Sequence, residues 1–108
     1  MQHVIVTATA TSVSCTPDPI QIYRDDQFIR FSLGVDTAWD NDAISFNSSW
    51  PGGAPMLDVS GTFIANANTP LAANITSPVT YGVTFKVIHT VTGNKFTHDP
   101  EVENQPQP

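Results

Sequence analysis

Residues 79–104, VTYGVTFKVIHTVTGNKFTHDPEVEN, decide the fold. Apolar and polar side chains alternate along both arms of this stretch, as they do in a β-strand that buries one face. Gly93-Asn94 lies between the arms and is typical of the two-residue loops that connect antiparallel strands. The stretch therefore predicts a β-hairpin in which Thr92 pairs with Lys95.

This register predicts which side chains share a face of the hairpin. It places Lys86 opposite Glu101, and it places His89 opposite His98 on the apolar side. The predicted apolar face consists of Tyr81, Val83, Phe85, Val87, Val91, Phe96, Pro100 and Val102. We expect this face to form one wall of the core.

The opposing wall is predicted to be a strand over residues 28–35. Its apolar row consists of Ile29, Phe31, Leu33 and Val35. Alternation also predicts a long strand over 3–15 that bends or changes register near residues 12–14, and short strands over 20–23 and 44–46. It predicts a strand over 56–66 with Leu57, Val59, Gly61 and Phe63 on one side. Residues 36–55 are otherwise expected to be irregular. Because turn signals separate these strands and no helical period is present, we expect an all-β, immunoglobulin-like Greek-key β-sandwich of about seven to eight strands.

The length and charge limit the classes of protein that the chain can belong to. Its 108 residues fit one domain, predicted over 1–104, and residues 105–108 are expected to be a disordered tail. Ten acidic residues against four basic ones give a net charge of −6, which repels nucleic acid and anionic lipid. Cys15 is the single cysteine, so no disulfide can form within the chain. We expect a cytoplasmic protein with no nucleic-acid or membrane partner.

Two segments resemble a known family. DPIQIYRDDQFIRF at 18–31 and HDPEVEN at 98–104 are similar to the DP-EP family of small uncharacterised bacterial proteins. The resemblance implies a β-sandwich and transfers no catalytic residue. Residues 19–31 are also similar to the second-strand region of cupredoxins. The chain departs from that family at the copper ligands, because Cys15 lies near the N-terminus and not beside C-terminal histidine and methionine ligands.

Histidines and aspartates are the candidate metal ligands. His89 and His98 are weak candidates, because an opposed pair supplies two ligands where zinc needs three or four. The amine of Met1 together with His3 could bind Cu(II) or Ni(II) as an incidental N-terminal site. We expect no resident cofactor.

One loop concentrates polar oxygen atoms and aromatic rings. Asp36, Asp40 and Asp42 are a possible calcium cluster, but the loop lacks the glycine and the distal glutamate of an EF-hand. Trp39 and Trp50 lie among polar, proline-rich and glycine-rich residues and could offer flat faces to a sugar or a protein, although such tryptophans more often plug the ends of a sandwich. The candidate binding residues are therefore Trp39, Trp50, Asp40 and Asp42.

The sequence shows no catalytic constellation, because no serine, cysteine or carboxylate has a base partner at a known spacing. We therefore expect a non-catalytic protein-interaction or structural module, with a protein partner or self-association. The alternative is a small-ligand or carbohydrate-binding module that uses the loop tryptophans. Burial of the two tryptophans distinguishes these functions.

Overall fold

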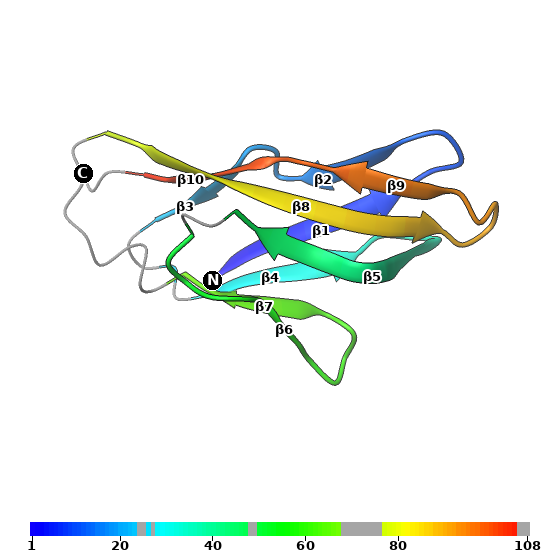
Figure 1. The fold of residues 1–108 in the computed structure, drawn as a ribbon, viewed down its shortest axis with the longest axis horizontal. Helices are drawn as coiled ribbons and strands as arrows, with labels where there is room; N and C mark the ends of the chain where they lie inside the picture. The colour runs from blue at the N-terminus through cyan, green and yellow to red at the C-terminus, as the bar shows by residue number, and fades with distance from the viewer. Residues whose placement is uncertain (24–25, 27, 48–49, 68–76, 106–108) are drawn as a thin grey trace.

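The computed structural model describes residues 1–23, 26, 28–47, 50–67 and 77–105 (Figure 1). These residues form ten β-strands and no helix, which confirms the predicted all-β class. The strands are β1 (Gln2–Ala8), β2 (Val13–Thr16), β3 (Ile20–Ile22), β4 (Phe28–Leu33), β5 (Thr37–Phe46), β6 (Met56–Leu57), β7 (Phe63–Asn66), β8 (Val79–His89), β9 (Lys95–His98) and β10 (Glu101–Asn104). A membrane-spanning helix is accordingly not found in the described ranges.

The strands form two mixed sheets. The first has the order β2-β1-β4-β7-β6 and the second the order β3-β10-β8-β5, with β9 also paired to β8. Most neighbours are antiparallel, but β1 runs parallel to β4 and β3 runs parallel to β10. Figure 1 shows β8, the longest strand, between β5 on one side and β9 and β10 on the other, with β1 and β4 passing behind them.

The predicted hairpin exists, but its register is different. His98 pairs with Phe85 rather than with His89, a shift of four residues. The backbone N–H of Gly93 donates to the carbonyl of His89 at 2.7 Å, and the N–H of His89 donates to the carbonyl of Asn94 at 2.8 Å. The loop is therefore longer than the predicted two residues, and Gly93, with φ of 76°, supplies the left-handed conformation near its end.

The new register corrects the predicted pairs and preserves the predicted faces. The pairs Thr92–Lys95, Lys86–Glu101 and His89–His98 were wrong, because Lys86 pairs with Thr97 and Glu101 pairs with Gly82. A shift by an even number of residues keeps each side chain on its own side of the sheet. The predicted apolar positions that are buried are Val83, Phe85, Val87, Pro100 and Val102, whereas Val91 is exposed in the loop.

The core contains side chains from both sheets. Phe31 of β4 and Phe85 of β8 are fully buried, and their ring centroids lie 5.4 Å apart in an edge-to-face arrangement. Val87 is also fully buried, and Leu33 is partly buried against the same core. This confirms the predicted core of these four residues. Full burial of each large apolar side chain stabilises the fold by about 1.5–3 kcal/mol.

Two other predicted apolar rows end earlier than the pattern suggested. Val35 was expected in the core but is 77% exposed, because β4 ends at Leu33 and the chain turns through Asp36 with φ of 54°. The predicted strand over 3–15 is in fact the antiparallel hairpin of β1 and β2, closed by the bond from the N–H of Thr9 to the carbonyl of Ser12 at 2.8 Å. Both errors arise because a short turn can preserve the alternation of side chains.

The strand β5 occupies much of the segment predicted to be irregular. Trp39 pairs with Val87 and Ile44 pairs with Phe85, so residues 40–43 oppose Lys86 alone. This insertion is a large β-bulge, which breaks the ladder of hydrogen bonds and bends the strand. Asp42 lies within it with φ of 52°.

At the C-terminus, Gln105 is not part of a free tail. Its N–H donates to the carbonyl of Ile22 at 3.0 Å, and its side-chain amide donates to Glu103 at 2.9 Å. Residues 106–108 of the predicted tail lie outside the described residues.

Candidate functional site

The two tryptophans are packed against other rings. Trp50 is 7% exposed, and its ring stacks on Phe46 with centroids 4.3 Å apart and planes 10° apart. Tyr81 approaches the same indole edge-on at 5.1 Å. The burial of Trp50 therefore leaves no flat face open to a sugar ring.

Trp39 is half-buried. Its Nε1 donates to the carbonyl of Gly61 at 2.9 Å, and Phe63 packs edge-to-face on its ring at 5.2 Å. These contacts join β5 to the hairpin of β6 and β7, so the indole contributes to packing between the two sheets.

The aspartates of β5 do not converge on a common point. Asp40 accepts a hydrogen bond from the N–H of Asn41 at 2.8 Å, and Asp42 is exposed. Within the described ranges, only one group of three metal-ligating side chains lies close together, and it includes neither of these residues nor Asp36. The absence of a calcium requirement stays a prediction.

The two histidines lie in different environments. His89 is buried, and its Nδ1 lies 2.8 Å from the Oγ1 of Thr92. His98 sits on β9 with its Nε2 3.1 Å from a carboxylate oxygen of Asp18. The expected histidine pair was wrong because the hairpin loop is longer than two residues, which moves His98 along β8.

His98 instead belongs to a group with Cys15 and Asp18. One potential ligand atom from each side chain lies within 4.8 Å of the others. Burial of the Cys15 thiol, together with the charge and hydrogen bond of Asp18, raises its pKa to about 12. The thiol is therefore protonated at neutral pH. Sequence reasoning noticed His98 but had no signal that would place Cys15 beside it.

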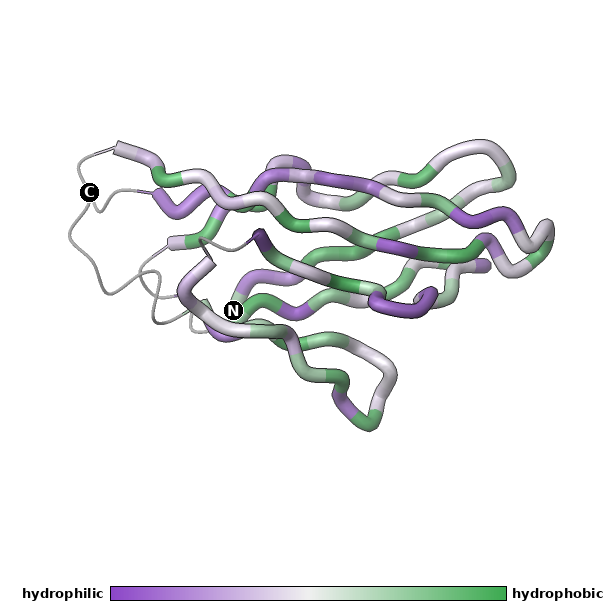
Figure 2. Tube along the Cα trace, in the orientation of Figure 1, coloured by the Kyte–Doolittle hydropathy of each residue, from purple (hydrophilic) through white to green (hydrophobic). Residues whose placement is uncertain are grey.

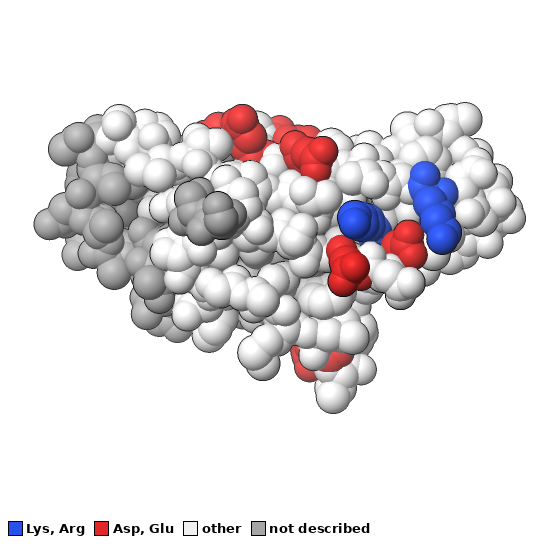
Figure 3. Space-filling model, in the orientation of Figure 1, with Lys and Arg blue, Asp and Glu red and all other residues white. Residues whose placement is uncertain are grey.

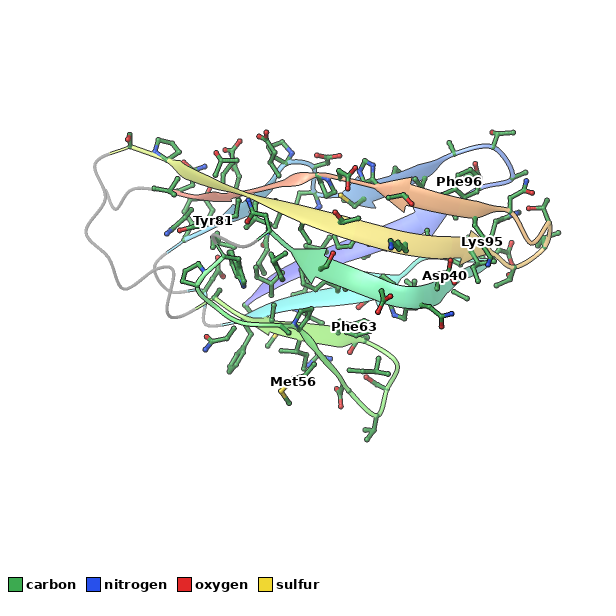
Figure 4. The ribbon with its side chains drawn as sticks, in the orientation of Figure 1. Asp40, Met56, Phe63, Tyr81, Lys95 and Phe96 are labelled. Atoms are coloured by element: carbon green, nitrogen blue, oxygen red, sulfur yellow. The ribbon has the colours of Figure 1, made fainter. Side chains whose placement is uncertain are left out.

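A groove of about 450 Å³ with a mainly apolar lining lies at the end of the first sheet. Its lining residues are Phe28, Gly52, Ala54, Met56, Leu57, Asp58, Ile64 and Asn66. Met56 is 74% exposed, Leu57 is 61% exposed and Phe28 is 42% exposed. Figure 4 shows Met56 projecting away from the sheets, and Figure 2 shows hydrophobic residues along the hairpin that projects there.

Local hydrogen bonds explain why this hairpin projects. The N–H of Asp58 donates to the carbonyl of Thr62 at 2.7 Å, and Gly61 turns the chain with φ of 84°. Arg30 of β4 stabilises the turn, because its guanidinium donates a hydrogen bond to Thr62 Oγ1 at 3.0 Å and lies 3.6 Å from the carboxylate of Asp58. The predicted strand over 56–66 was wrong, since the turn divides it into β6 and β7.

The groove was missed from the sequence for the same reason. A continuous strand would have buried Leu57 and Val59 on the side of Phe63, whereas the turn leaves both exposed. Alternation alone does not distinguish an apolar row in a core from one on an open surface.

No model of a known protein family matches the chain. A search of curated proteins finds no relative.

Proposed function

We propose that the protein is a non-catalytic interaction module that binds an extended apolar segment of a partner protein at the groove beside β6. The observation that supports this function most strongly is the exposure of Met56, Leu57 and Phe28 around one opening. Apolar side chains that gather at an exposed surface mark binding sites more often than isolated ones do.

The shape and position of the groove favour a peptide-like occupant. In the strand order β6 is the last strand of the first sheet, so an extended segment could align beside it and hydrogen-bond to its backbone. Side chains of that segment that turn back over the sheet would reach Ile64 of the neighbouring strand β7, whereas Phe28 lies one strand further in, on β4. Methionine at such a surface adapts its shape to different partners.

Charge favours a foreign partner over a second copy of the chain. Two copies that each carry a net charge of −6 repel each other. Figure 3 shows basic groups close to acidic ones on one face, and the groove itself contains the carboxylate of Asp58. Asp58 already lies 3.6 Å from Arg30, so the complementarity rests on the net charge of −6, which favours a partner segment with apolar residues flanked by lysine or arginine.

The state of Cys15 supports a role without catalysis. A nucleophilic cysteine needs a lowered pKa and an adjacent base. Here the pKa of the buried thiol is raised, and the Nε2 of His98 lies 3.1 Å from a carboxylate oxygen of Asp18, so this nitrogen is already engaged. The alternative function, carbohydrate binding through Trp39 and Trp50, loses its main support because one ring is buried and the other is packed.

Selection from a peptide library tests the proposal. A displayed library of random dodecapeptides is panned on the immobilised chain, and bound peptides are then measured against three proteins: the parent chain, Leu57→Asp, and Val91→Asp. We expect peptides with alternating apolar residues and flanking basic residues, with at least about tenfold weaker binding to Leu57→Asp. Val91→Asp, at an apolar site in the β8–β9 loop that is also well exposed, should bind like the parent.

Equal binding to the parent and to Leu57→Asp would refute the groove as the site. Sedimentation of the chain alone is the second readout. A dimer that Leu57→Asp dissociates and Val91→Asp does not would replace the partner segment with a second copy.

We also propose an immunoglobulin-like fold, a relationship to the DP-EP family and a cytoplasmic location. An immunoglobulin-like Greek-key β-sandwich is supported by the shared core of the two sheets and by the way the chain passes repeatedly between them, and it must accommodate the parallel pairs β1–β4 and β3–β10. Kinship with the DP-EP proteins is supported by the segments 18–31 and 98–104. A cytoplasmic location is supported by the single thiol.

A further inference from the structure

We propose that Cys15, Asp18 and His98 form a metal site of the zinc type between β2 and β9. Cys15 is in β2, Asp18 lies in the connection that follows, and His98 is the last residue of β9. The three side chains come from positions up to 83 residues apart, yet their ligand atoms all lie within 4.8 Å of one another.

The distances fit one small ion after a modest adjustment. The Nε2 of His98 lies 3.1 Å from the Oδ2 of Asp18. A tetrahedral zinc ion that binds nitrogen and oxygen at about 2.0–2.2 Å would hold these two atoms about 3.4 Å apart. The Cys15 sulfur, bound at about 2.3 Å, would lie about 3.5 Å from each of them. Changes in these separations of a few tenths of an ångström to about 1.3 Å therefore suffice.

The chemistry of the donors selects the metal. A thiolate, an imidazole and a carboxylate together suit zinc, and cobalt(II) can replace zinc in such a site. Calcium and magnesium favour sets of oxygen ligands and are disfavoured. Three protein ligands leave a fourth position for water or for a donor from a partner.

To bind the metal ion, the Cys15 sulfur must exchange its proton for the ion. The Cys15 Sγ–H bond breaks, its proton passes to solvent, and the sulfur lone pair forms the bond to the metal ion; no electron is gained or lost. The hydrogen bond that Sγ donates to the carbonyl of Pro17 at 3.5 Å is lost. The hydrogen bond between the Nε2 of His98 and the Oδ2 of Asp18 is lost as well: the Nε2–H bond breaks, its proton moves to Nδ1 or to solvent, and the freed Nε2 lone pair and a carboxylate oxygen of Asp18 bind the ion.

The position gives the ion a structural role. β2 belongs to the first sheet and β9 pairs with β8 of the second, and the two strands lie next to each other. An ion held by Cys15 and His98 would link the sheets directly at this edge. His98 and Asp18 are partly exposed, so an ion can enter from solvent.

Titration with cobalt(II) and zinc tests the site. The experiments use the full chain in a His3→Gln background, with the thiol kept reduced, because the N-terminal amine and His3 could bind a divalent ion by themselves. We expect one cobalt ion per chain, visible bands of a tetrahedral ion, and a thiolate-to-cobalt charge-transfer band. Zinc should displace the cobalt and, at about 100 times its Kd, raise Tm by about 10 °C.

Variants assign the ligands. His98→Gln and Asp18→Asn should each weaken the binding of cobalt and zinc by about tenfold to 100-fold. Cys15→Ser should abolish the charge-transfer band. His89→Gln is the matched control, because this histidine lies on the neighbouring strand outside the group and should leave binding unchanged. Circular dichroism checks the fold of each variant. The Asp18 side chain is 42% exposed, so Asp18→Asn should fold normally and can test the site even if Cys15→Ser does not fold.

Two results would overturn the site. One is a cobalt spectrum without a thiolate band. The other is an affinity for cobalt or zinc that does not change in Asp18→Asn and His98→Gln, or that falls in His89→Gln by as much as in those two variants.

Discussion

Replacement of Phe85 by alanine tests the core most directly. The side chain is fully buried in β8, and its ring lies 5.4 Å from that of Phe31 in the other sheet. Loss of a buried phenylalanine side chain costs about 3–5 kcal/mol, from lost apolar burial and from the cavity that remains. A domain of this size has a free energy of unfolding of about 5–15 kcal/mol, so Phe85→Ala should remove at least about a fifth of it and could remove all of it.

Urea denaturation followed by tryptophan fluorescence measures this loss. With a slope of about 2 kcal/mol per M, the midpoint should fall by about 2 M, whereas Val91→Ala in the exposed loop should move it little. A loss below about 1 kcal/mol for Phe85→Ala would show that the ring is not central to the core.

A cycle of milder changes tests whether the two sheets contact each other through these rings. Phe31→Leu and Phe85→Leu are made singly and together, so that every variant stays folded. An edge-to-face pair contributes about 0.5–1.5 kcal/mol beyond burial, so the double variant should be less destabilised than the sum of the singles by about that amount. Additivity within about 0.3 kcal/mol would refute the contact.

Two further predictions concern single sites. The folded pKa of Cys15 is raised to about 12, above the unfolded value of about 8.5, so the unfolded chain loses this proton first as the pH rises. In the presence of chelator, the free energy of unfolding should therefore be intact below pH 8.5 and should fall between pH 9 and 12. Urea midpoints measured across that range should show this fall, and Cys15→Ala should flatten it. Millimolar calcium should leave Tm unchanged, and a rise of several degrees that is absent in the Asp40→Ala, Asp42→Ala double variant would contradict this.

Alternation of side chains was enough to predict the faces of the main strands. Phe31, Phe85 and Val87 are buried as expected, because a residue's side of a sheet depends only on whether its position is odd or even within the strand. Register depends on the loop, and here Gly93 has a positive φ at the end of a longer loop and not within a two-residue turn. The sequence around Gly93 is compatible with both.

Contacts between distant segments were the part that local patterns could not supply. Cys15 and His98 meet because β2 and β9 come together from opposite ends of the chain, and no spacing in the sequence encodes this. Trp39 and Trp50 were singled out as candidate binding residues, but Trp50 is buried and stacks on Phe46. Exposure of Leu57 followed from the turn at Gly61, which alternation concealed.

The bulge in β5 limits how this molecule can aggregate. β5 is the last strand in the order of the second sheet, and ten residues of regular edge would template the addition of further chains into a fibril. Residues 40–43 interrupt that edge with two carboxylates and an amide, so an incoming strand could not keep a continuous ladder past Trp39. Shortening this segment to a regular strand would therefore be expected to make the protein prone to fibril formation while leaving its core intact.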